Sequence, residues 1–113
     1  MHELPITKSI LDWACLYAEK AKAQKVVTIV LQLGVLRDLK KEWLQRYFRY
    51  ISRDTIAAEA VLVYRHVPAE LRCRKCGKVF IARETDFRCP DCKESEVDIV
   101  AGRELYLESM EVE

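Results

Sequence analysis

Four of the five cysteines are arranged as two C-x-x-C pairs, Cys73/Cys76 and Cys89/Cys92. Two cysteines at this spacing can both reach one ion from a tight turn, and residues 77–88 between the pairs suit a short hairpin that joins two such turns. Structural Zn²⁺ takes four thiolates in a tetrahedron, with Zn–S distances of about 2.3 Å. Because four thiolates leave no position open for water or a substrate, the spacing predicts a structural zinc ion and not a Lewis acid.

Residues around these cysteines favour the two turns. Gly77 follows the first pair, where such a turn often needs a positive φ, and Pro90 lies inside the second pair, where a fixed φ favours a turn. Two disulfides or a dithiol redox pair are the alternatives. The sequence has no signal peptide, so we expect a cytoplasmic protein, where a reducing environment disfavours disulfides, and a doubled motif fits a redox pair poorly.

His2 is a second candidate metal ligand because of its position in the chain. The α-amine of Met1, the amide nitrogen of His2 and the His2 imidazole Nδ1 can bind one ion together. An amide nitrogen coordinates only after losing its proton, which Ni²⁺ and Cu²⁺ can drive in the square-planar geometry typical of both ions. The amide or the carboxylate of Glu3 could complete the plane, and the alternative is a histidine with no metal role.

Other signs of chemistry are few. Cys15 lies within a helical pattern and is expected to be a small core residue, and His66 is expected at a surface or half-buried at the end of a strand. The sequence has no Gly-rich phosphate loop, no G-x-S-x-G and no H-E-x-x-H, so we expect no enzyme. The formal net charge of +1 does not indicate a general nucleic-acid or membrane binder.

Hydrophobic periodicity predicts the order helix, strand, helix, strand, zinc module, strand. The expected elements are a helix from Ile6 to about Lys22, a strand from Val26 to Leu33, a helix from about Leu39 to Ser52, a strand from about Glu59 to Val67, a zinc module over Leu71 to Asp98, and a strand from about Glu104 to Val112. Asp38 is the expected N-cap of the second helix.

The fold predicted from this order is α+β: a small three-stranded sheet covered on one face by two helices, with an inserted zinc-ribbon-like lobe. The last two strands are expected to pair antiparallel. The expected domains are residues 1–68 plus 101–113, which would bind nickel, and residues 69–100, which would bind zinc. The expected buried stripes of the helices are Ile6, Ile10, Trp13, Ala14, Tyr17, Ala18 and Ala21, and Leu39, Trp43, Leu44, Tyr47, Phe48 and Ile51. The lysines and arginines between the residues of the second set are interpreted as a solvated face. The alternative is a basic patch formed by Lys40-Lys41, Arg46, Arg49 and Arg53.

The whole chain resembles the HypA/HybF family, the nickel metallochaperones of [NiFe]-hydrogenase maturation. The matching features occur in the family's order: Met1-His2-Glu3, the strand ending at Gly34, Thr55 and Glu59-Ala60, the two C-x-x-C pairs, and Gly102-Arg103-Glu104-Leu105. The resemblance implies nickel held at the N-terminus through His2 with Glu3 adjoining, and zinc held by Cys73, Cys76, Cys89 and Cys92. It also implies delivery to a hydrogenase large subunit together with the GTPase HypB, and some members also serve urease maturation.

Departures from the family concern the metal sites. Pro5 stands where a small polar residue is frequent, and no histidine flanks either C-x-x-C pair. A further nickel ligand could come from the loop after Gly34, where Asp38 is the candidate. The alternative function is a zinc-ribbon module that binds nucleic acid or protein, but the lobe's acidic residues nearly cancel its basic ones and only Phe80 and Phe87 could stack on bases.

Overall fold

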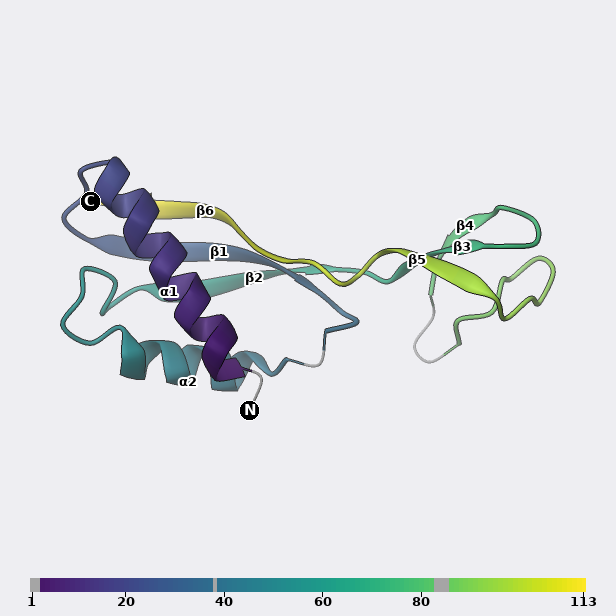
Figure 1. The fold of residues 1–113 in the computed structure, drawn as a ribbon, viewed down its shortest axis with the longest axis horizontal. Helices are drawn as coiled ribbons and strands as arrows, with labels where there is room; N and C mark the ends of the chain where they lie inside the picture. Colours follow the sequence, from purple (N-terminus) through teal and green to yellow (C-terminus); the bar gives the residue numbers. More distant parts are fainter. Residues whose placement is uncertain (1–2, 38, 83–85) are drawn as a thin grey trace. The chain divides into compact units, whose positions relative to one another are not determined.

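The protein is represented by a computed structural model, which describes residues 3–37, 39–82 and 86–113. Its elements are α1 (Glu3–Lys20), β1 (Val26–Gly34), α2 (Lys41–Ile51), β2 (Val61–Val67), β3 (Glu70–Cys73), β4 (Val79–Ile81), β5 (Val97–Ala101) and β6 (Leu105–Val112) (Figure 1). Among the described residues, no helix is both long and apolar enough to cross a membrane.

The chain forms two compact units. The first consists of Met1–Gln32, Asp38–Arg65 and Tyr106–Glu113, and the second of Leu33–Arg37 and His66–Leu105. Each unit contains most of one three-stranded sheet, with strand order β2-β1-β6 in the first and β4-β3-β5 in the second. The predicted domains were a nickel-binding domain, residues 1–68 plus 101–113, and a zinc-binding domain, residues 69–100. They remain a prediction, because compactness alone does not show which unit binds which metal.

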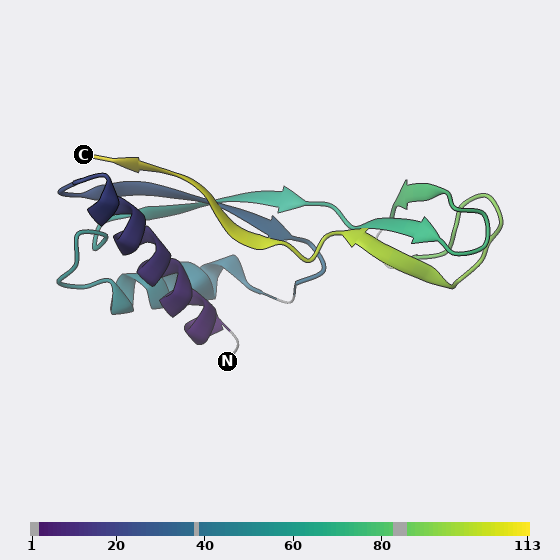
Figure 2. The same ribbon diagram turned by 45° about the horizontal axis from the view of Figure 1, so that its top comes forward.

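In the first unit, one face of the sheet is buried against the two helices. Ile29 and Leu31 of β1 and Leu62 of β2 are buried there against both helices. The opposite face carries exposed polar contacts: Thr28 donates to Glu111, and Gln32 to Glu108. The two helices therefore cover one face of the sheet, as Figures 1 and 2 show from two directions. The predicted α+β fold is confirmed.

The helix faces differ in part from the prediction. Small side chains, Ala14 and Ala18, are fully buried on α1, whereas Trp13 and Tyr17 are 40% and 50% exposed. On α2, Leu44 and Phe48 are buried and Trp43 is 40% exposed. The buried face of α1 also includes Thr7 and Leu11, which the predicted stripe left out. The predicted α1 stripe was therefore displaced around the helix, with its aromatic rings at the margin of the true buried face. The further predicted core position Ala21 is also exposed.

Three other predictions for the first unit were wrong. The last two strands of its sheet do not pair with each other, because β1 lies between β2 and β6. The helix α2 begins at Lys41, and its N-cap is Lys40 with no side-chain cap hydrogen bond, so Asp38 is not the N-cap. In β6, Met110 packs against the same core as Leu107, three positions earlier, and not on the opposite face as alternation predicts.

The second unit holds the C-x-x-C pairs on a small antiparallel sheet. Leu71 of β3, which is 2% exposed, pairs with Phe80 of β4 on one side and with Ile99 of β5 on the other. The sequence does not predict β5 as a strand of its own, because its isolated signal is weak and it forms by pairing with β3.

Two glycines allow close backbone contact within this unit. A Cβ at Gly34 would lie 2.0 Å from the carbonyl oxygen of Gly102. Leu36 N–H donates to that same oxygen at 2.8 Å, and Gly34 N–H donates to the carbonyl of Glu104 at 2.7 Å. The end of β1 therefore fits against residues 102–104 only without a side chain at position 34.

Candidate metal centre

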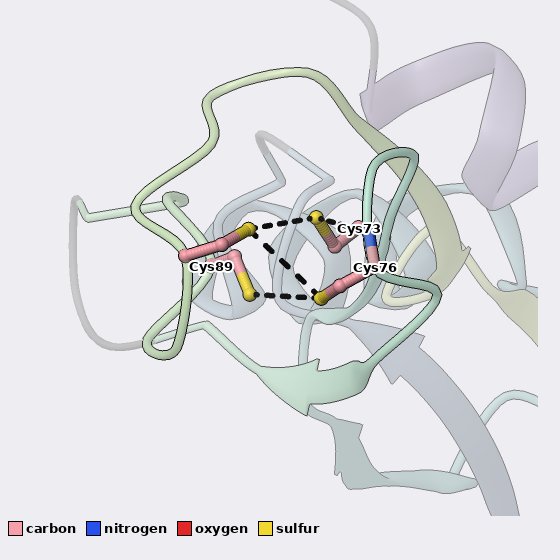
Figure 3. A group of neighbouring side chains, drawn as sticks. Cys73, Cys76 and Cys89 are labelled. Carbon is pink, nitrogen blue, oxygen red and sulfur yellow. Dashed lines mark hydrogen bonds between the residues drawn. The ribbon is translucent and has the colours of Figure 1, made fainter.

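The four paired cysteines meet at one point. Their Sγ atoms all lie within 4.8 Å of one another. Cys73 and Cys92 are 3.4 Å apart, Cys76 and Cys89 are 3.6 Å apart, and Cys76 and Cys92 are 3.9 Å apart. Four sulfurs placed tetrahedrally at about 2.3 Å from one ion would be about 3.8 Å from each other. The observed spacing fits one tetrahedral ion, and Figure 3 shows the sulfurs of Cys73, Cys76 and Cys89 pointing toward a shared centre.

Disulfides do not account for this group. All five cysteines are free, and the shortest Sγ–Sγ distance given above, 3.4 Å, is far longer than a disulfide bond of about 2.05 Å.

The two C-x-x-C turns share one backbone pattern. In the first turn, Gly77 has φ +77° and donates its N–H to the carbonyl of Cys73 at 2.9 Å. In the second, Lys93 has φ +63° and donates to the carbonyl of Cys89 at 2.9 Å. The positive φ predicted at Gly77 is confirmed. The equivalent role of Lys93 was missed, although its place directly after the second C-x-x-C was a usable signal.

Backbone N–H groups of the turns favour thiolates. The N–H of Cys76 lies 3.5 Å from Cys73 Sγ and, as the main cause, lowers the pKa of Cys73 to about 7. The backbone N–H of Cys92 acts in the same way on Cys89 and lowers its pKa. Because metal ions bind the thiolate, these turns prepare the first cysteine of each pair as a ligand.

Charges around the group are partly paired. Lys78 Nζ lies 3.1 Å from Asp91, Arg74 Nε lies 2.8 Å from Asp98, and Arg88 Nε lies 3.2 Å from Asp86. These exposed pairs add little stability. They do neutralise much of the basic surface that a nucleic-acid-binding module would need.

The remaining predicted ligands are not part of this group. His2 and Asp38 lie outside the described residues. Glu3 is the first residue of α1, where its carboxylate interacts with the backbone N–H of Lys40 and its carbonyl accepts a hydrogen bond from Thr7. His66 is exposed on β2. Within residues 3–37, 39–82 and 86–113, the four cysteines form the single cluster of three or more metal-ligand side chains.

Cys15 packs against the core of the first unit, as predicted. Burial, followed by the charge of Asp12, raises the pKa of its thiol. It therefore stays protonated at neutral pH and is a poor metal ligand.

Comparison with known proteins identifies the family. The family model described as "Hydrogenase/urease nickel incorporation, metallochaperone, hypA" matches residues 1–112. The chain belongs to the HypA family. The resemblance drawn from the sequence is thereby confirmed, and the family is one of metallochaperones that serve hydrogenase and urease.

Individual relatives agree over full length. The hydrogenase maturation factor HypA of Dehalococcoides mccartyi strain 195 is 37% identical over 113 residues, covering 100% of this chain and 95% of that protein. The HypA of Caldanaerobacter subterraneus is 38% identical over 114 residues, covering 100% of both. The solution structure of the Ni metallochaperone HypA from Helicobacter pylori is 25% identical with a TM-score of 0.71, covering 97% of this chain and 96% of that one. A second HypA solution structure has a TM-score of 0.75 at 26% identity, covering 99% and 96%.

Proposed function

We propose that this chain is a nickel carrier that binds Ni²⁺ at its own N-terminus and delivers it for maturation of a [NiFe]-hydrogenase. The observation that carries the proposal is the match to the nickel-incorporation family over residues 1–112. The proposed ligands are the imidazole and amide of His2, with the amine of Met1, and Glu3 adjoining. Its action is carriage and not turnover, because a terminal site leaves one face of the ion open for ligand exchange with an acceptor.

Glu3 supports a nickel site that includes the loop before α2. Its interaction with the backbone N–H of Lys40 brings the start of α1 to the segment that precedes α2. Asp38 is two residues before Lys40, so it remains our proposed additional ligand.

For the four-cysteine group we propose Zn²⁺ as the resident ion. Cys73, Cys76, Cys89 and Cys92 would hold it, and the bound ion would supply structure to the second unit and no reaction step. The sulfur spacing supports this choice.

The proposed partners are the HypB GTPase and the hydrogenase large subunit, with urease maturation factors as further candidates. The family's place in hydrogenase and urease nickel incorporation supports such partners.

The test is a Ni²⁺ titration of tag-free, zinc-loaded protein, followed by calorimetry and by d–d absorption. His2→Ala should lose the one equivalent of nickel bound by the wild type and keep its zinc. His66→Ala is the matched control, because His66 is the other histidine of the chain and is exposed on β2. Equal nickel affinity in wild type and His2→Ala would rule out the N-terminal site.

Nickel binding should also weaken as pH falls. The ion must displace protons from an amine with an ordinary pKa near 8 and an imidazole with an ordinary pKa near 6.5. The same titration repeated across that range therefore reports which donors are used.

A further inference from the structure

Helix α2 exposes an aromatic and cationic stripe. Trp43, Arg46, Tyr47 and Tyr50 follow one another at i, i+3, i+4 and i+7, which places them along one side of the helix, and Arg53 lies in the turn two residues beyond the end of the helix. Trp43 is 40% exposed and Tyr50 is 65% exposed, and both arginines are exposed. These five residues are called the α2 stripe below.

Side chains of the stripe hold each other in place. The Trp43 and Tyr47 rings stack with centroids 5.7 Å apart and an interplanar angle of 29°. The Arg46 guanidinium lies 5.0 Å from the Trp43 ring centre, and that of Arg53 lies 4.4 Å from the Tyr50 ring centre. The two guanidinium groups are thus pre-organised, so less side-chain entropy is lost when they meet a carboxylate.

The charge of this region is unbalanced. Residues 40–54 carry five cations and two carboxylates, although the whole chain has a net charge of only +1. In contrast to the lobe, none of these five cations forms an ion pair with a carboxylate among the described residues. Trp, Tyr and Arg are also the residues that most often dominate the energy of protein interfaces. The stripe therefore complements an acidic protein surface.

A nucleic-acid base would be a poorer fit. Stacking of a base needs an open ring face, whereas Arg46 and Tyr47 already lie against the Trp43 ring. Tyr47 and Tyr50 each have a single neighbour among the ring contacts described above.

The position of α2 relates the stripe to the proposed nickel site. Trp43 N–H donates to the carbonyl of Lys40 at 3.1 Å, and the N–H of Lys40 interacts with the Glu3 carboxylate. The start of α1 lies beside the first turn of α2 in both views (Figures 1 and 2). A protein bound on the stripe would therefore approach the proposed nickel ligands.

We propose that the α2 stripe is the docking surface for an acidic segment of the protein that receives nickel from this chain. The inference rests on the proposed function, because it needs an acceptor protein. It adds where that acceptor binds and what chemistry its surface carries.

The test compares Arg46→Glu/Arg53→Glu with the control Lys20→Glu/Lys22→Glu, which makes the same charge change at exposed positions at the end of α1 and in the turn after it. Affinity for nickel-free hydrogenase large subunit and for the HypB GTPase is measured separately by calorimetry at low and high salt. We expect the stripe variant to bind at least one of them about tenfold more weakly, the control to stay within about twofold, and wild-type binding to weaken with salt. Binding of the stripe variant within about twofold of wild type would overturn the inference.

A second readout reports on the stripe directly. In protein labelled with 5-fluorotryptophan, the ¹⁹F resonance of Trp43, assigned with Trp43→Phe, should shift when the acceptor binds. An unchanged resonance in the bound state would overturn the inference.

Further measurements distinguish a failure of the docking inference from a failure of the proposed function. Nickel uptake by the stripe variant is measured as in the previous section, and normal uptake shows that the proposed nickel site is unaffected. If the wild type binds nickel but neither protein, the partner part of the proposed function fails and the docking inference is overturned with it. If the wild type associates with itself or binds RNA and the stripe variant does not, the docking inference would be overturned, because the stripe would then bind a second copy of the chain or RNA.

Discussion

The residue that follows each C-x-x-C pair has a positive φ, and its conformational strain affects how easily the turn forms. Gly77 and Lys93 occupy the same place in the two turns, with φ +77° and +63°. Glycine adopts this conformation freely, whereas a residue with a side chain is strained there by about 1 kcal/mol. The first turn is therefore relaxed and the second carries a small strain.

Substitutions at these two positions should have opposite effects on zinc affinity. Gly77→Ala should weaken binding and Lys93→Gly should strengthen it, each by about 1 kcal/mol. No atom lies within 4 Å of the position where a Cβ at Gly77 would stand, so the cost there is purely conformational. Competition with a chromophoric chelator measures both, and changes of the same sign would contradict the account.

The Tyr64 hydroxyl should make stability depend on alkaline pH. Burial, followed by the charge of Glu42, raises the pKa of Tyr64 above its ordinary value. Below about pH 10 the phenol is protonated in both the folded and the unfolded protein, and its contribution to the free energy of unfolding is fully present. Above about pH 10 the unfolded chain loses the phenol proton first, so the free energy of unfolding falls as pH rises. Tyr64→Phe should remove this part of the decline. Urea midpoints from about pH 9 to about 11 for both proteins test it, and parallel curves would contradict it.

Among the elements, the strands β1, β2 and β6 and the metal motif were the easiest to predict. An apolar run with Thr28 and Gln32 on one face identified β1, and the C-x-x-C spacing identified the four cysteines. Helix α1 was located but its buried face was displaced, because the apolar rings of Trp13 and Tyr17 suggested a face that leaves out the buried Leu11. The order β2-β1-β6 depends on pairing between distant segments, about which local pattern says nothing.

The two faces of α2 should respond very differently to truncation of an aromatic ring. Phe48 is fully buried, and Phe48→Ala should lower the free energy of unfolding by about 3–5 kcal/mol through lost burial and a cavity. Trp43→Ala, on the same helix and 40% exposed, should cost about 1 kcal/mol or less. Chemical denaturation of the two variants makes the comparison. Similar losses would mean that Trp43 is a core residue after all.

For the whole molecule, the two compact units depend on different forces. The hydrophobic core made by α1, α2, β1 and β2, with Leu107, Met110 and Val112 of β6 against it, lies within the first unit. The second unit has few buried apolar side chains beyond Leu71 and the cysteines themselves. Below about 70–80 residues a single core rarely gives much stability by itself, and such small folds often add a metal or another cross-link.

Removing the metal should therefore unfold one unit and leave the other folded. In an NMR spectrum of ¹⁵N-labelled protein, excess chelator or Cys73→Ala should collapse the amide signals of residues 66–104. Signals from α1, β1 and α2 should persist. Cys15→Ala is the control and should retain one zinc, because Cys15 is not a member of the cluster. A fully dispersed spectrum for metal-free protein would show that the second unit folds without the ion.

The central place of β1 has a consequence for the order of events during synthesis. β1 pairs with β2, which follows within the next 40 residues, and with β6, which leaves the ribosome only after both C-x-x-C pairs have been made. Both C-x-x-C pairs are thus synthesised while the sheet beneath the two helices still lacks a strand. If the lobe folds in that order, a growing chain would bind the proposed zinc ion before it could complete the unit proposed to carry cargo.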